Sequence, residues 1–336
     1  MSTASHEHAT ETAPDLPAFE PLPDAAHFPI PSAERGLPTV EAELFCAVDL
    51  GEDTPAGKSL LEGLAFTHDG DLLVCNPPMG RIYRIDMASR TARLWCQLPG
   101  DLQPTAAKIH RDRRVFATCV SFEAETTVVA LTPEGAIDER IVASADHLYD
   151  DMVFDREGGF YLSDLSGSIA RPTAGVWYVA PGAHEAQPVV EGLVMTNGIA
   201  LSPDEGTLWV TEFGTGRLHC LHLDGSHRVA RFGGSHVAYQ FTGLEGPDSA
   251  CIDADGNLYV ALCGQGRFLV FNRHGAPVGQ FLIPGRSEGR MLMSTHPQIR
   301  PNTRELYLCS ADPATGAAAI FRARALAPAH LGFAFS

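Results

Sequence analysis

Four side chains that offer oxygen ligands recur at one position of a repeated motif. They are Glu62, Asp150, Asn197 and Asp248, and each begins a short apolar run. Carboxylate and carboxamide oxygens favour hard cations such as Ca²⁺, Mg²⁺ or Mn²⁺, and Zn²⁺ is a less favoured alternative. Carboxylates brought together without a cation would repel one another and lose solvation. If the fold makes these positions converge, the sequence predicts a divalent-cation site.

The motif is part of a repeat that runs through most of the chain. An apolar strand, a turn, a second apolar strand and a third strand after a glycine follow each first position, and two weaker copies begin at Ala106 and Thr295. The first positions are 62, 106, 150, 197, 248 and 295, so the intervals are 44, 44, 47, 51 and 47 residues. This period is typical of β-propeller blades. The sequence therefore predicts an all-β, six-bladed β-propeller with a metal in its central channel; a pair of β-sandwiches does not explain six evenly spaced copies.

A propeller would position the candidate ligands on one ring, because the first strand of every blade lines the channel. The strand near Glu43–Val48 precedes the first unit and is expected to pair with the last blade and close the circle. The alternative is that the four residues merely begin strands, since Asp and Asn favour turns. Turn preference would not select one register in four units. Other acids, including Asp155, Asp204 and Asp253, follow the first strand and are expected to be turn residues.

Composition limits the domain organisation and the partners. Residues 1–38 are rich in Pro, Ala and acidic residues and are expected to form a flexible tail or a surface strap, with the propeller over residues 39–336. Lys+Arg 24 against Asp+Glu 41 gives a net charge of −17, which argues against nucleic-acid or anionic-membrane binding. No apolar stretch is long enough to span a membrane. Eight cysteines without a CxxC pair indicate free thiols in a reducing, cytoplasmic location. The oligomeric state stays open.

Two histidines are candidates for substrate contact. His110 and His296 lie in inner-strand segments and could face the channel, although a hydrogen-bonded structural histidine is the more frequent outcome. A serine hydrolase is not indicated, because the chain has no GxSxG motif.

The repeats also carry a family resemblance. The segments Leu61–Phe66, Asp150–Phe160, Asn197–Ser202 and Glu245–Ser249, with the run 256–296, resemble the senescence marker protein/gluconolactonase family of calcium-dependent lactonases. The resemblance implies a channel calcium held by Glu62, Asp150, Asn197 and Asp248, with Ser249 as a further contact. It also implies that Asp248 transfers protons.

The function implied by this resemblance is hydrolysis of a small lactone by water at a metal-polarised carbonyl. A non-catalytic calcium-binding propeller and a protein-interaction scaffold are the alternatives, since fold alone does not decide function. The family also implies a second, structural calcium on loops before Asp150. The corresponding stretches, 120–125 and 142–147, lack the ligand pattern, with Val142 at the position of an acid, so a second site is not expected.

Overall fold

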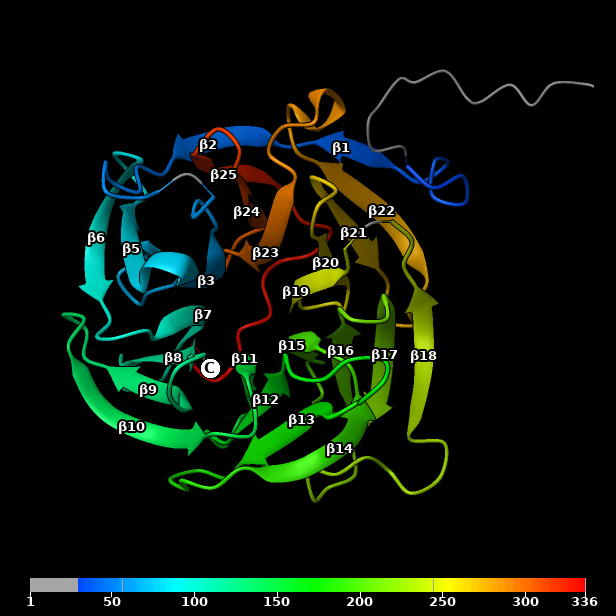
Figure 1. Cartoon of the computed structure of the whole chain (residues 1–336). Coiled ribbons are helices and arrows are strands. Elements are labelled where there is room, and N and C mark those ends of the chain that lie inside the picture. The colour runs from blue at the N-terminus through cyan, green and yellow to red at the C-terminus, as the bar shows by residue number, and fades with distance from the viewer. Residues whose placement is uncertain (1–29, 56, 244, 336) are drawn as a thin grey trace, which may run out of the picture.

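Six sheets, antiparallel apart from one parallel edge strand, surround a central channel in the computed structural model, which describes residues 30–55, 57–243 and 245–335 (Figure 1). The described residues form strands and two short 3₁₀ helices, η1 (Pro77–Met79) and η2 (Arg286–Glu288). No helix in this part of the chain is long and apolar enough to cross a membrane. The predicted all-β, six-bladed propeller is confirmed.

The first three blades each contain four consecutive strands, ordered from the channel outwards. Blade 1 contains β3 (Glu62–Phe66), β4 (Leu72–Asn76), β5 (Arg81–Asp86) and β6 (Thr91–Gln97). Blade 2 contains β7 (Gln103–Ile109), β8 (Val115–Val120), β9 (Thr126–Leu131) and β10 (Ile137–Ser144). Blade 3 contains β11 (Tyr149–Phe154), β12 (Phe160–Asp164), β13 (Ala174–Val179) and β14 (Gln187–Leu193).

The remaining blades follow the same plan, and two of them take a strand from the N-terminal part of the chain. Blade 4 contains β15 (Thr196–Leu201), β16 (Thr207–Glu212), β17 (Arg217–His222) and β18 (Ser235–Gln240). Blade 5 contains β19 (Pro247–Ile252), β20 (Leu258–Leu262), β21 (Arg267–Phe271), β22 (Pro277–Leu282) and β1 (Thr39–Glu41). Blade 6 contains β23 (Met293–Ile299), β24 (Glu305–Asp312), β25 (Ala317–Arg324) and β2 (Glu43–Ala47).

The circle closes as the sequence predicts, because β2 pairs antiparallel with β25 and becomes the outer strand of the last blade. The segment before β2 makes a strand pairing that the sequence did not indicate. Strand β1 pairs parallel with β22 of blade 5. Residues 30–38, at the end of the predicted tail, pack against the same blade, where buried Glu34 forms an ion pair with buried Arg267. These nine residues therefore act as a strap, and residues 1–29 lie outside the described residues.

Buried apolar side chains fill the spaces between neighbouring blades. Leu61 and Leu64 of blade 1 pack with Tyr307 and Ile320 of blade 6, and equivalent clusters join the other pairs. The inner strands are buried almost throughout, since each is covered on both faces. The turns after them are closed by acids, as expected: Asp155 Oδ1 accepts the backbone N–H groups of Glu157 and Gly159, both at 2.9 Å.

Every inner strand has an irregular register near the predicted ligand position. In blade 1, for example, three residue steps from Glu62 to Ala65 oppose two steps on β4, and the other five inner strands show a matching shift. A β-bulge of this kind re-aims side chains that would otherwise alternate between faces. The bulge therefore allows the side chains of two consecutive residues to point toward the channel.

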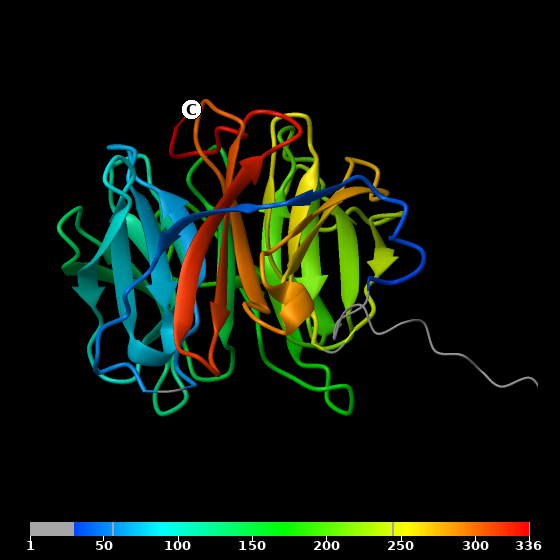
Figure 2. The ribbon, with the colours of Figure 1, turned by 90° about the horizontal axis from the view of Figure 1, so that it is seen from above.

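The two ends of the channel are covered by different segments. Helices η1 and η2 lie at the end where the inner strands begin, because η1 follows β4 and η2 precedes β23. The loop after β12, which contains exposed Ile169, belongs to this same end. The C-terminal segment lies at the opposite end (Figure 2).

Candidate metal centre

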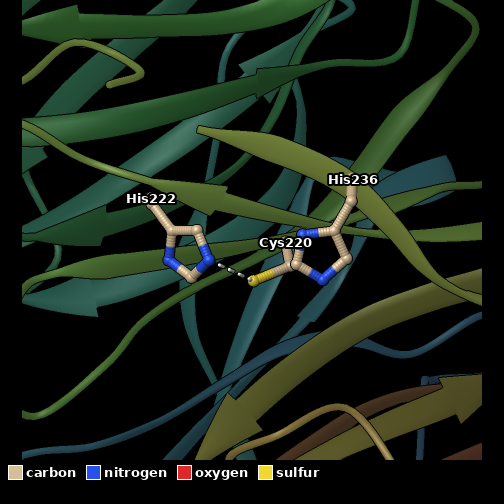
Figure 3. A group of neighbouring side chains, drawn as sticks. All are labelled: Cys220, His222 and His236. Atoms are coloured by element: carbon tan, nitrogen blue, oxygen red, sulfur yellow. Dashed lines mark hydrogen bonds between the residues drawn. The ribbon is translucent and has the colours of Figure 1, made fainter. Parts of the chain in front are cut away.

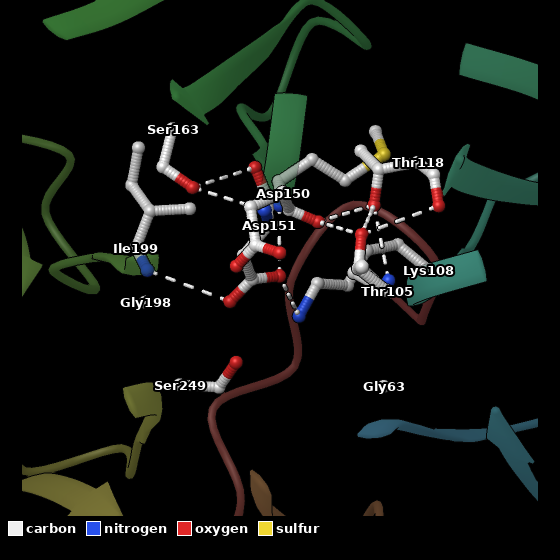
Figure 4. Close-up of polar contacts among 12 residues, drawn as sticks. Gly63, Thr105, Lys108, Thr118, Asp150, Asp151, Ser163, Gly198, Ile199 and Ser249 are labelled. Atoms are coloured by element: carbon white, nitrogen blue, oxygen red, sulfur yellow. Dashed lines mark hydrogen bonds and ion pairs between the residues drawn. The ribbon is translucent and has the colours of Figure 1, made fainter. Parts of the chain in front are cut away.

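Four of the blades bring the predicted ligands together at the end of the channel where the inner strands begin. Glu62, Asp150, Asn197, Asp248 and Ser249 are between 2% and 8% exposed, so they are buried but still reach solvent. The acids lie close enough for each to influence the ionisation of the others. Figure 4 shows the carboxylates of Asp150 and Asp151 and the hydroxyl of Ser249 pointing toward one space. Asp248 therefore lies near Glu62, Asp150 and Asn197, which agrees with the predicted ring.

Asn197 provides the test of whether this centre suits a cation. Its side chain hydrogen-bonds the carboxylate of Asp248, while its Oδ1 is buried and finds no hydrogen-bond donor among the described residues. A buried acceptor without a donor is costly. This oxygen lies beside the Asp248 carboxylate, and a cation bound between them would satisfy both groups. The donor set is therefore all oxygen and fits a hard divalent cation.

The acids of the ring have strongly shifted pKa values. Burial, and then the charges of neighbouring acids, raise the pKa of Glu62 and Asp150 well above their ordinary values. Burial likewise raises the pKa of Asp248 to about 7, against hydrogen bonds from the Ser249 N–H, Cys263 and Asn197. Such shifts cluster at functional sites.

Hydroxyl groups fix the backbone from which the ligands project. Thr118 and Thr105 of blade 2 donate to the Asp150 carbonyl, the latter at 2.7 Å. Thr211 of blade 4 donates to the Asp248 carbonyl at 2.8 Å. These bonds cross from one blade to the next, so they hold neighbouring ligand positions in a fixed relation.

Two glycines allow the inner strands to approach closely. A Cβ on Gly198 would lie 2.5 Å from the Asp248 carbonyl oxygen and 2.7 Å from the Ser249 Cα. A Cβ on Gly63 would lie 2.8 Å from the Ala106 Cα, and Gly63 also has a φ of +57°. Side chains at either position would push neighbouring blades apart at the ring.

A second polar layer lies directly below the ring and was missed by the sequence analysis. The next residue in blade 3, buried Asp151, forms an ion pair with Lys108 at 3.0 Å and accepts the Ile199 N–H at 3.4 Å. His296 is fully buried, and neither of its ring nitrogens has a hydrogen-bond partner in the described chain. Burial, and then the charge of Lys108, lower its pKa well below the ordinary value. His296 therefore lies close to Lys108, in the polar group that Lys108 forms with Asp151. The signals for this layer were the Asp-Asp pair and a lysine next to the apolar pair Ala106–Ala107 in an inner strand.

The structure does not bring His110 to the ring. This residue follows the last residue of β7, four positions beyond Ala106, which is about 13 Å along a strand. Its ring stacks on Phe116 at 5.0 Å and lies 4.9 Å from Phe333, while Nδ1 bonds Asp112 at 2.7 Å. His110 therefore lies away from the ring end, and its position does not favour the prediction that it contacts substrate there.

The opposite end of the channel contains an apolar cavity of about 460 Å³. Phe66, Phe154, Leu201 and Lys108 contribute to its wall, together with residues 330–335 of the C-terminal segment. This segment crosses the channel opening in Figure 1.

The loops at which the family implies a second calcium are organised by the chain itself. Asp101 accepts a hydrogen bond from the Ser121 hydroxyl at 2.6 Å and from the N–H groups of Phe122 and Glu123 at 3.1 and 2.9 Å. Val142 is buried in the neighbouring strand.

Comparison with known proteins identifies the family. The SMP-30/Gluconolactonase/LRE-like region family matches residues 143–312. Lactonase drp35 of Staphylococcus haemolyticus (strain JCSC1435) is 44% identical over 283 residues, covering 82% of this chain and 86% of the relative. The chain belongs to the SMP-30/gluconolactonase family.

Solved structures of the family share the fold at low sequence identity. Regucalcin from Agrobacterium tumefaciens, described as a calcium-binding protein, superposes with a TM-score of 0.65 at 18% identity, over 87% of this chain and 98% of the other. A gluconolactonase from Xanthomonas campestris gives 0.64 at 15% identity, over 85% and 97%. The family resemblance read from the sequence is thus confirmed.

Proposed function

We propose that this protein is a calcium-dependent lactonase that hydrolyses the ester bond of a small lactone. The observation that carries the proposal is the unpartnered Asn197 Oδ1 among three buried carboxylates. Family membership, with a lactonase 44% identical to this chain, adds the reaction class. Glu62, Asp150, Asn197, Asp248 and Ser249 would hold the cation, and Ca²⁺ fits their oxygen donors better than Zn²⁺ does.

A bound cation would supply polarisation of the lactone carbonyl and stabilisation of the developing oxyanion. Asp248 acts on the nucleophile: it accepts a proton from water as the new C–O bond forms. It then returns the proton to the ring oxygen as the ester C–O bond breaks. Its Oδ1 accepts the Ser249 N–H at 2.9 Å, which fixes the carboxylate orientation. A ligand carboxylate is a weaker base, so the proposal requires one Asp248 oxygen to remain off the cation.

The surroundings suit a small substrate that enters at the ring end. Pro77–Met79, the loop 166–172 and the segment 286–293 surround this entrance and supply apolar side chains, including Ile169 and Met291. Eight buried free cysteines support a reducing, cytoplasmic location.

The test is hydrolysis of dihydrocoumarin and of glucono-1,5-lactone by the full chain at neutral pH. We expect activity that EDTA abolishes and Ca²⁺ restores. Activity unaffected by EDTA would remove the cation from the reaction. Calcium binding without hydrolysis of either lactone would favour the non-catalytic calcium-binding propeller instead. Glu205→Gln is the matched control, because Glu205 lines the cavity at the other end.

A further inference from the structure

Three side chains with nitrogen and sulfur ligands meet on the outer half of blade 4, away from the oxygen ring. Cys220 and His222 are two residues apart on β17, so they project from the same face of the sheet. His236 lies directly opposite Cys220 in the β17–β18 ladder. One ligand atom from each of the three lies within 4.8 Å of the others (Figure 3).

The spacing of these atoms is close to that of a metal site. Cys220 Sγ lies 4.0 Å from His222 Nε2. Typical Zn–S and Zn–N bond lengths in a tetrahedral site place the two ligand atoms about 3.6 Å apart. A rotation of one exposed histidine side chain closes the difference. The burial also suits such a site, since the thiol is covered while both histidines are exposed and leave a path for an ion.

A neighbouring hydroxyl selects the ring orientation that a metal requires. Thr207 Oγ1 lies 3.3 Å from His222 Nδ1, on the strand next to β17. When Nδ1–H donates to this oxygen, the lone pair of Nε2 is left facing Cys220. Metal-ligating histidines are commonly oriented by a hydrogen bond of this kind through the second ring nitrogen.

We propose that Cys220, His222 and His236 form a second metal site, selective for a borderline transition-metal ion such as Zn²⁺, with water in the fourth position. Thiolate and imidazole ligands distinguish this site from the oxygen ring, which takes hard cations. The site would fasten β18 to β17 across the connection 223–234. Because β18 is the outermost strand of its blade, it gains most from such a link.

The experiment uses the full chain, freed of metals by chelation and titrated with Co²⁺ as a spectroscopic probe. We expect one equivalent to produce a near-ultraviolet thiolate-to-cobalt charge-transfer band that Zn²⁺ displaces. Cys220→Ser should abolish the band, and Cys46→Ser, which alters another buried free cysteine, should leave it intact. Thr207→Val should weaken binding about tenfold.

Two further variants keep the proposal falsifiable if Cys220→Ser fails to fold. His222→Gln and His236→Gln alter exposed side chains, and each should weaken Co²⁺ binding about tenfold or more. Glu62→Gln should leave the band unchanged, because Glu62 belongs to the ring. Absence of the band at stoichiometric Co²⁺, or a band unaffected by both histidine substitutions, would overturn the site.

Discussion

The same inner strands build two chemically opposite ends of one channel. Where the strands begin, they present Glu62, Asp150, Asn197 and Asp248. Four residues later they present apolar side chains, Phe66, Phe154, Leu201 and Ile252, which line a cavity together with Lys108, Glu205 and residues 330–335. The ends are about 13 Å apart along each strand. The residues with oxygen ligands therefore lie where the inner strands begin, and the apolar residues lie four positions later in the same strands.

Local backbone geometry accounts for the difference. At the ring end every inner strand has a register shift, so consecutive residues such as Asp248 and Ser249 can both face the centre. At the other end pairing is regular, and residues 330–335 cover the opening. At the polar end, β-bulges direct the side chains toward the centre. At the apolar end, residues 330–335 lie over the opening.

The largest expected effect is on catalysis at the ring end. Asp248→Asn should lower kcat/KM for a lactone about 10²–10⁴-fold, because the carboxylate that transfers the proton is lost. Circular dichroism should show the fold retained. Glu205→Gln, at the cavity end, should leave kcat/KM unchanged. Near-normal turnover by Asp248→Asn would remove this residue from the reaction.

The next effect is on stability and its pH dependence. Glu62, Asp150 and Asp248 have raised pKa values in the folded protein, to about 7 for Asp248. A raised carboxyl pKa stabilises the fold below the ordinary pKa, and this contribution is lost as pH rises through the folded value. The Tm of the metal-free protein should therefore fall from about pH 5 to about pH 8.

Bound calcium should remove most of this decrease in Tm with pH, because the cation neutralises the ionised carboxylates. At a concentration 100 times its Kd it should add about 2.7 kcal/mol to the free energy of unfolding. The calcium-induced Tm shift, measured by scanning calorimetry, should thus be larger at high pH. Glu62→Gln should reduce both the fall and the shift. A calcium-induced shift of equal size at both pH values would contradict the electrostatic description of the ring.

A smaller effect tests the close approach of blades at the ring. Gly198→Ala should cost about 2 kcal/mol in unfolding free energy and weaken calcium binding, because its Cβ meets the backbone of Asp248 and Ser249. Gly225→Ala is the matched control, since nothing lies within 4 Å of a Cβ there. Denaturant unfolding measures both. Equal stabilities for the two variants would show that the blades can separate at the ring without cost.

The smallest effect belongs to the cavity end. Phe333 packs beside Phe154, and Arg111 lies over its ring. Phe333→Leu should cost about 1 kcal/mol in stability. Lactone turnover and calcium affinity should not change, because this residue lies beyond the layer of Lys108 and Asp151. A raised KM for the lactone would instead indicate that substrate uses this end.

The repeat made much of the fold and the ring predictable. Six first positions at similar intervals placed Glu62, Asp150, Asn197 and Asp248 on inner strands, and the closing strand was found from its position before the first unit. The period is visible in the sequence because every blade packs the same kind of apolar face against its neighbour. The strap of residues 30–38 has no such repeat, so its buried Glu34–Arg267 pair could not be foreseen.

The features that sequence missed depend on register and on long-range contacts. Regular alternation would place Asp151 on the opposite face from Asp150, and only the bulge brings both to the channel. His110 followed the repeat in sequence but lies past the end of its strand, where an aromatic cluster holds it. The pairing of Cys220 with His236 depends on the length of the β17–β18 connection, which no local pattern specifies.

Isothermal titration of the chelator-treated full chain with Ca²⁺ examines the ring itself. One calcium ion should bind per chain, and Asn197→Leu should abolish or strongly weaken this binding while the fold persists. The substitution should weaken calcium binding because it removes the Asn197 Oδ1, a buried oxygen that has no hydrogen-bond donor in the described chain. Absence of calcium binding by the unaltered protein, or binding of equal affinity by Asn197→Leu, would contradict a cation held at this ring.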